Sequence, residues 1–247
     1  MTERQGVGYV LARMRGLYAI VDAGALDVRG LDPLAFAAAL LSVSPVALQL
    51  RAKNVSARET LALLRELAPM CHRTGVLLVA NDRPDLALMA GCDLVHVGQD
   101  DMPIDRVRRI APGLGVGVST HTLEQLDAAL AARPAYVAFG PVFQTTTKAY
   151  PDPVVGVPAL KTAYARAQAA GVPLVAIGGI TRERAPSLVT AADAIAVVAD
   201  LLPPTGEADA APPAGQVLQQ VLQEVTARAR ALRDLFTQAP TRVLAAL

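Results

Sequence analysis

Short apolar runs recur along most of the chain, separated by segments with helix-start signals. The runs are of strand length and rich in Val, Ile, Leu and Ala, which is typical of strands buried on both faces in a parallel sheet. They predict strands at 17–21, 46–51, 77–80, 93–97, 114–119, 136–140, 173–177 and 194–198. Eight strands alternating with helices over roughly 200 residues predict a (β/α)8 TIM barrel, with an open doubly wound α/β sheet as the alternative.

The segments between the runs carry N-cap and capping-box spacings. Asp32-Pro33, Ser56 with Glu59, and Thr122 with Gln125 each mark a helix start. Further helices are predicted at 85–90, 104–110, 157–170, 182–190 and 216–236. We therefore divide the chain into a polar, helical N-terminal extension (1–15), a barrel catalytic domain (16–202), and a loop, closing helix and tail (203–247).

The stretch 77–101 makes the first chemical prediction. It predicts strand, short helix and strand, and such a crossover makes the two strands parallel. Asp82 and Asp101 end these strands, so they must lie at the same edge of the sheet. Two carboxylates at one edge repel each other unless a proton or cation lies between them, and Mg²⁺ is commonly held by one or two carboxylates plus substrate phosphate. The simpler alternatives are a helix cap at Asn81-Asp82 and solvated turn residues at Asp100-Asp101.

Composition narrows the class of protein. The 247 residues are 53% hydrophobic with a net charge of +1, so charge indicates neither nucleic-acid nor membrane-surface binding. Two cysteines, Cys71 and Cys92, allow no disulfide framework or metal-binding cysteine cluster, which suits a reducing compartment. No run has the length of a membrane span, and the N-terminus lacks a signal-peptide core. We expect a cytoplasmic protein.

Polar residues gather where the predicted strands end. Gln49, Arg51 and Lys53 alternate with apolar residues, so they share one side of the second strand, facing the barrel interior or its mouth. The alternative is a frayed, solvated strand end.

Later strand ends add hydroxyls, a cation and glycines. Ser119 ends the fifth strand and can face the mouth; Thr145, Thr147 and Lys148 in the 141–155 loop suit phosphate oxygens. That loop is long enough to act as a lid, although a Thr-rich surface loop is the alternative. Gly178-Gly179 allows backbone amides to approach an anion.

Two histidines lie near the predicted rim. His96, within the fourth strand, is interpreted as a core histidine with satisfied hydrogen bonds. His121 is either a helix-start residue or an acid/base.

Taken in order, these motifs resemble the thiamine phosphate synthase family. The resemblance covers roughly 16–202 and rests on Gln49-Leu-Arg51-Ala-Lys53, Asn81-Asp82, Gly98-Gln-Asp-Asp101, Gly117-Val-Ser119, Thr145-Thr-Thr147-Lys148 and Ile177-Gly-Gly-Ile180. It implies that the pyrimidine diphosphate or its pyrophosphate is bound by Gln49, Arg51, Lys53, Asn81, Ser119, Thr145, Thr147 and Lys148. It implies Asp82 and Asp101 as Mg²⁺ ligands, and a thiazole phosphate on the backbone amides of Gly179, Val198 and Ala199.

The sequence departs from the family pattern near the expected phosphate site. Gln144 stands where the family usually has proline, and Ala199 where it often has serine. Asp200 beside a phosphate is unfavourable unless its side chain turns away.

The implied reaction joins 4-amino-5-hydroxymethyl-2-methylpyrimidine diphosphate to 4-methyl-5-(2-phosphooxyethyl)thiazole, giving thiamine phosphate and pyrophosphate. Arg51, Lys53, Lys148 and Ser119 are the expected catalytic residues, acting without a protein nucleophile. The alternatives are a thiazole tautomerase-like paralogue, which would need no diphosphate site, and a non-catalytic thiamine-phosphate-binding protein. Homo-oligomerisation and the role of 203–247 stay open.

Overall fold

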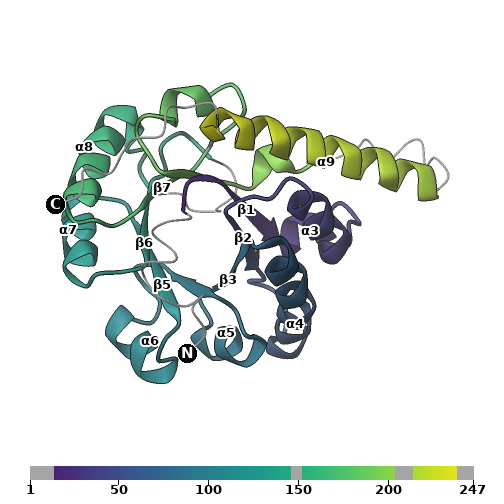
Figure 1. Cartoon of the computed structure of the whole chain (residues 1–247), viewed down its shortest axis with the longest axis horizontal. Coiled ribbons are helices and arrows are strands. Elements are labelled where there is room, and N and C mark those ends of the chain that lie inside the picture. The colour runs from purple at the N-terminus through teal and green to yellow at the C-terminus, as the bar shows by residue number, and fades with distance from the viewer. Residues whose placement is uncertain (1–13, 146–151, 204–213, 238–247) are drawn as a thin grey trace.

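Eight parallel strands close into a barrel in the order β1 to β8 (Figure 1). The computed structural model describes residues 14–145, 152–203 and 214–237. The strands are β1 (Gly16–Asp22), β2 (Ala47–Arg51), β3 (Leu77–Asn81), β4 (Leu94–Val97), β5 (Gly115–Thr120), β6 (Tyr136–Phe139), β7 (Leu174–Ile177) and β8 (Ala194–Val197). The predicted (β/α)8 barrel is confirmed, and β1 pairs with β8, which excludes the open sheet.

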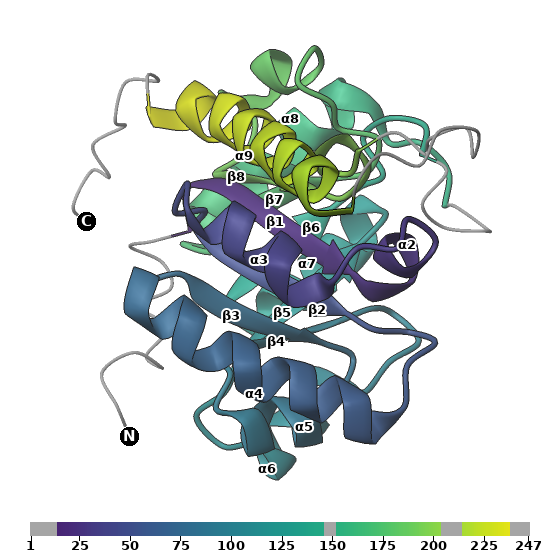
Figure 2. The same ribbon diagram turned by 90° about the vertical axis from the view of Figure 1, so that its right-hand side faces the viewer.

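Helices surround the barrel (Figure 1). They are α2 (Ala23–Asp27), α3 (Pro33–Leu41), α4 (Ala57–Thr74), α5 (Pro84–Ala90), α6 (Ile104–Ile110), α7 (Leu123–Ala131), α8 (Gly156–Ala169) and α9 (Ala214–Thr237), with 3₁₀ turns η2 (Ala185–Leu188) and η3 (Ala199–Leu201). The predicted closing helix is α9, which lies against β1 and α3 (Figure 2). No helix in the described segments is long and apolar enough to cross a membrane.

The strand period of two creates two separate apolar layers. On β2, Leu48 and Leu50 belong to the large layer between strands and helices. Ala47 belongs to the smaller layer inside the barrel, with Tyr18 and Tyr136. The residues that alternate with the leucines, including Gln49, therefore face the interior, as the sequence predicts.

Glycines on β5 make room inside the barrel for large side chains of its neighbours. A Cβ on Gly117 would overlap the ring of Tyr136, and one on Gly115 would overlap Leu94. The missing side chains on β5 are therefore filled by β4 and β6, which keeps the interior packed.

Two local predictions differ from the structure. The helix expected at 182–190 is only the short turn η2, because Pro186 provides no N–H and restricts the residue before it. The helix α2 was not expected; Asp22 begins it by accepting a hydrogen bond from the Ala25 amide at 3.0 Å. Of the N-terminal extension and the tail, 1–13 and 238–247 lie outside the described residues, so the domain division stays a prediction.

We expect Gly117→Ala to lower the free energy of unfolding by about 1–3 kcal/mol, since the added methyl group must displace the buried Tyr136 ring. Urea denaturation measures the change. Gly24→Ala is the matched control, because a Cβ there lies 3.6 Å from Asp22 Oδ1, an ordinary contact, on a helix. Equal stability of the two variants would show that the interior of the barrel is not tightly packed at β5.

Candidate active site

A cavity of about 620 Å³ opens at the carboxyl-end rim of the barrel. It has the size of a small-molecule site. Every rim residue predicted from the sequence that lies in the described segments lines it: Gln49, Arg51, Lys53, Asn81, Asp82, Asp101, Ser119, Thr145, Gly179, Val198 and Ala199. Thr147 and Lys148 lie outside the described residues.

Asp82 and Asp101 meet in this cavity, as the strand–helix–strand argument predicts. Asp82 has a left-handed backbone, with φ of 62°, and its amide donates to the His96 carbonyl at 2.8 Å. Asp101 Oδ2 accepts from the Gly98 amide at 2.7 Å. Burial, a hydrogen bond that protonated Asp82 donates to Asp101, and the negative charge of Asp101 raise the pKa of Asp82 to about 6, against the opposing effect of Lys53 and Arg51. Asp82 therefore keeps its proton to a higher pH than an ordinary aspartate does.

Basic side chains lie next to the carboxyl pair. Lys53 Nζ is 3.7 Å from Asp82 Oδ2, and Lys53 is half-exposed. Arg51 forms a short ion pair with Asp22, which is buried. Sequence reasoning missed this role of Asp22, although the pairing of β1 with β2 places Asp22 directly opposite Arg51. Asp22 therefore fixes the direction of the Arg51 guanidinium.

Polar side chains inside the barrel form a continuous chain of hydrogen bonds. Its links are Ser119 Oγ to His96 Nε2 (2.8 Å), His96 Nδ1 to Tyr136 Oη (2.8 Å), Tyr136 Oη to Tyr18 Oη (2.8 Å), Tyr18 Oη to Gln49 Oε1 (2.6 Å) and Gln49 Nε2 to Asn81 Oδ1 (2.9 Å). His96 is therefore the buried, satisfied histidine that was predicted, but it also lines the cavity. Tyr18 and Tyr136 were missed because an isolated tyrosine in an apolar strand carries no functional signal.

The opposite wall of the cavity is made by the loops after β6, β7 and β8. Gly178 and Gly179 have φ of 99° and 64°, and a Cβ on Gly179 would overlap the carbonyl oxygens of Phe143 and Gln144. Glycine is therefore required where these two loops touch. Val198 and Ala199 complete this wall.

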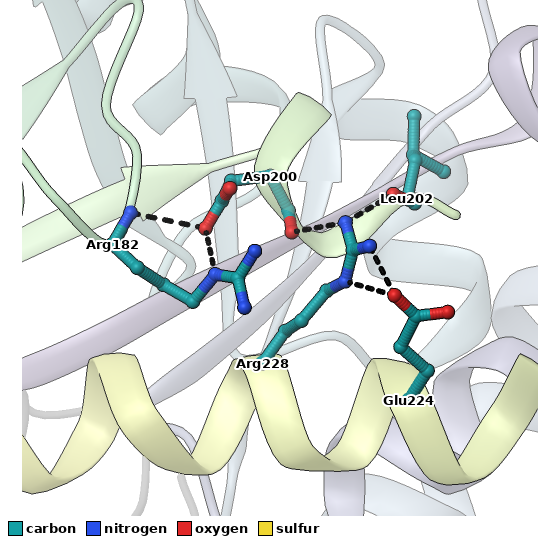
Figure 3. Close-up of polar contacts among 5 residues, drawn as sticks. All are labelled: Arg182, Asp200, Leu202, Glu224 and Arg228. Atoms are coloured by element: carbon teal, nitrogen blue, oxygen red, sulfur yellow. Dashed lines mark hydrogen bonds and ion pairs between the residues drawn. The ribbon is translucent and has the colours of Figure 1, made fainter. Parts of the chain in front are cut away.

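The Asp200 carboxylate turns away from this wall and binds Arg182 (Figure 3). Its Oδ2 accepts from the Arg182 backbone amide at 3.1 Å and from Nε at 3.0 Å. The contact joins the loop after β7 to the loop after β8. The unfavourable charge expected from the sequence is thereby paired.

Helix α9 holds the same turn from outside the barrel (Figure 3). Arg228 Nη1 donates to the carbonyl of Leu202 at 3.0 Å and to that of Asp200 at 3.4 Å, while Glu224 binds the same guanidinium. The closing helix therefore supports the loop that carries Val198 and Ala199.

Arg184 and His121 are further cavity residues. Arg184 donates to the Gly179 carbonyl at 2.7 Å, and its guanidinium lies 5.1 Å from the centre of the Phe143 ring. Sequence reasoning missed Arg184, because it placed this residue on a helix. His121 Nδ1 lies 2.6 Å from the Gly140 carbonyl oxygen, and Nε2 lies 3.5 Å from Asp152.

The fold and this cavity define a (β/α)8-barrel enzyme whose site is built from the loops at the carboxyl ends of the strands. The family model described as thiamine monophosphate synthase matches residues 17–201, and the chain belongs to this family.

Individual relatives agree with the family match. The chain is 48% identical over 193 residues to a thiamine-phosphate synthase of Koribacter versatilis, covering 75% of this chain and 88% of that protein. It is 36% identical over 224 residues to one of Methanocella arvoryzae, covering 90% and 95%. A solved thiamine phosphate pyrophosphorylase of Pyrococcus furiosus has a TM-score of 0.74 at 28% identity, covering 92% of this chain and 98% of that chain.

The carboxyl pair also suits a divalent cation. Among the described residues no group of three or more His, Cys, Asp and Glu could hold a metal by itself. Mg²⁺ does not need one, since it is commonly bound through one or two carboxylates with the remaining positions taken by water and phosphate oxygens. A cation would also offset the repulsion between the Asp82 and Asp101 carboxylates.

We expect Asp82→Asn to flatten the pH dependence of stability without metal. The folded-state pKa of Asp82, about 6, lies above 3.8, the ordinary value for an aspartate. Folding therefore favours its protonated form, and this stabilisation is lost as the pH rises through about 6. The free energy of unfolding, measured with a chelator from about pH 4 to about pH 7, should fall more in the wild type than in Asp82→Asn. Parallel curves would show that Asp82 titrates normally.

Proposed function

We propose that this chain is a transferase that joins the pyrimidine diphosphate to the thiazole phosphate, releasing pyrophosphate and giving thiamine phosphate. One observation carries the proposal: a single cavity brings paired carboxylates with cations to one wall and the glycine-lined loops to the other. Two anionic substrates need two such places close together. The names of the relatives support the same reaction.

We assign the pyrimidine diphosphate to the wall formed by β2, β3 and β4. Asp82 and Asp101 would hold Mg²⁺, which supplies positive charge to the diphosphate oxygens. Arg51 and Lys53 would add positive charge to the same group, and Thr145, Thr147 and Lys148 would reach it from the loop after β6. The ion pair with Asp22 partly neutralises the positive charge of Arg51. Lys53, Lys148 and Arg184 would therefore supply more of the positive charge that offsets the negative charge of the substrates.

The thiazole phosphate is assigned to the backbone amides of Gly179, Val198 and Ala199. Loops after the last two strands are the usual phosphate site of such barrels. Arg184 is close enough to the Gly179 carbonyl to add a positive charge there. The Arg182–Asp200 pair keeps a carboxylate away from the phosphate.

The proposed chemistry needs no protein nucleophile. Positive groups stabilise charge on the departing pyrophosphate, and the aminopyrimidine delocalises the positive charge left on its methylene carbon. The thiazole nitrogen, held on the opposite wall, then attacks that carbon. The protein contributes binding, orientation and electrostatic stabilisation.

A thiazole tautomerase would use the glycine-lined wall and His121 alone. It gives no reason for a half-buried pair of carboxylates beside Lys53, and that pair favours the transferase.

We expect Mg²⁺-dependent formation of thiamine phosphate when purified protein is given both substrates. Chromatography of the product against a no-enzyme control measures it. Binding of both substrates without any product would leave the non-catalytic binding protein as the better interpretation.

Removing the carboxylate of either Asp82 or Asp101 should remove most of the rate enhancement that the metal provides. We expect Asp82→Ala and Asp101→Ala each to lower kcat/KM for the pyrimidine diphosphate by about 10²–10³. The double variant should be little worse than the worse single variant, because both residues act on one ion. A wild-type response to Mg²⁺ concentration in both single variants would refute the metal assignment.

Arg182→Gln should raise the KM for the thiazole phosphate several-fold and leave that for the pyrimidine diphosphate nearly unchanged, since Asp200 loses its partner beside the phosphate. Steady-state kinetics with each substrate varied in turn gives both values. Arg166→Gln, which breaks the Arg166–Asp127 pair between α8 and α7, is the matched control. An equal rise in both KM values would place the phosphate elsewhere.

A further inference from the structure

The hydrogen-bond chain inside the barrel has a definite direction. Tyr18 donates its hydroxyl proton to Gln49 Oε1, and Gln49 Nε2 donates to Asn81 Oδ1. A phenol has only one proton to donate. The hydrogen bond between the two tyrosines must therefore be donated by Tyr136 and accepted by Tyr18.

The same argument passes to the histidine. Tyr136 donates its only proton to Tyr18. The hydrogen bond between Tyr136 and His96 must therefore be donated by His96 Nδ1. A neutral imidazole carries one proton, which leaves Nε2 as an acceptor. The bond at 2.8 Å between His96 Nε2 and Ser119 is then donated by the serine hydroxyl.

Burial couples the links of the chain, so that all of them share one direction. Tyr18 and Tyr136 are 2% and 0% exposed, and burial is the main cause that raises the pKa of both hydroxyls well above the usual value for tyrosine. Both phenols therefore keep their protons at any ordinary pH. None of the described buried side-chain nitrogen or oxygen atoms lacks a hydrogen-bond partner, so no link can reverse alone without leaving one unpaired.

We propose that Tyr18 and Tyr136 are positioning residues, which hold His96 as its Nδ1–H tautomer and thereby make Ser119 Oγ a hydrogen-bond acceptor toward the cavity. The proposal rests on the proposed function for the identity of the ligand. It deepens that function by assigning a role to three residues outside the expected site. It also couples two cavity walls, because Ser119 and Asn81 are the two ends of one chain.

The direction of the chain sets what the cavity offers to a ligand. Ser119 offers oxygen lone pairs at one end, and Asn81 offers its Nδ2 protons at the other, since its Oδ1 is taken by Gln49. An aminopyrimidine has the complementary groups, namely an exocyclic amine that donates and ring nitrogens that accept. In a pyrimidine with a carbonyl in place of the amine, the carbonyl oxygen would face the lone pairs of Ser119 Oγ. Two acceptors would then repel each other, and such a pyrimidine should bind poorly.

The state of the His96 ring can be measured without any substrate. The chain has three histidines, so ¹⁵N-histidine labelling gives three ring systems, and His96→Gln identifies the one of interest. At about pH 8.5, above the usual pKa of histidine, we expect a proton on Nδ1 and none on Nε2. A proton on Nε2, in a neutral or a charged ring, would overturn the proposal.

Tyr18→Phe tests the coupling at a distance. Without the Tyr18 hydroxyl, the Tyr136 proton has His96 Nδ1 as its remaining acceptor, so the histidine proton should move to Nε2. Tyr18 is bonded to Tyr136 and Gln49 rather than to His96, so a purely structural role would not predict this change. An unchanged tautomer in folded Tyr18→Phe would contradict the coupling.

Two further variants complete the test. Tyr164→Phe removes a tyrosine hydroxyl that binds Asp193 at 3.1 Å, away from the cavity, and should leave the tautomer as in the wild type. Gln49→Glu keeps an acceptor for Tyr18 and should keep His96 as Nδ1–H; a shifted tautomer there would overturn the proposal even if Tyr18→Phe does not fold.

Kinetics separates this proposal from the proposed function. Tyr18→Phe should raise the KM for the pyrimidine diphosphate about tenfold, with little change for the thiazole phosphate. If the wild type makes no thiamine phosphate but His96 has the expected tautomer, the proposed function fails while the chain direction stands. If both KM values rise equally, the chain does not select the pyrimidine.

Discussion

The closed parallel barrel is the constraint on which the site depends. Parallel strands in one ring must all end at the same rim, and the strand period of two sends alternate side chains inside. Residues separated along the chain, such as Asp22 and Arg51, are brought together by strand pairing alone. The chemistry of this protein follows from which polar residues occupy those inward and terminal positions.

Polar residues inside a barrel are costly unless they are paired. Here a hydrogen-bond chain offsets the free-energy cost of burying them. The rings of Tyr18 and Tyr136 pack in the apolar interior, and their hydroxyl groups link the chain. The Asp82–Asp101 pair is a place where two like charges lie close together. There the backbone of Asp82 is left-handed and burial raises its pKa, and such strain is typical of positions retained for ligand binding.

The sequence predicted the fold and most of the described rim because both depend on local signals. Apolar runs of strand length identify strands, and the crossover rule then places Asp82 beside Asp101 without any knowledge of the tertiary structure. Contacts between strands that depend on register, such as Asp22 with Arg51 and Tyr18 with Tyr136, could not be predicted in this way. Arg184 was missed for a different reason. The sequence pattern predicted a helix over 182–190, whereas Pro186 limits the helical part to the turn η2.

In the proposed site, Asp82 and Asp101 hold one divalent cation against the substrate diphosphate. Electron paramagnetic resonance with Mn²⁺ in place of Mg²⁺, recorded with pyrophosphate bound, tests it most directly. We expect one Mn²⁺ per chain with hyperfine coupling to phosphorus, and loss of that signal in both Asp82→Asn and Asp101→Asn. A phosphorus-coupled Mn²⁺ signal that survives in both variants would contradict it.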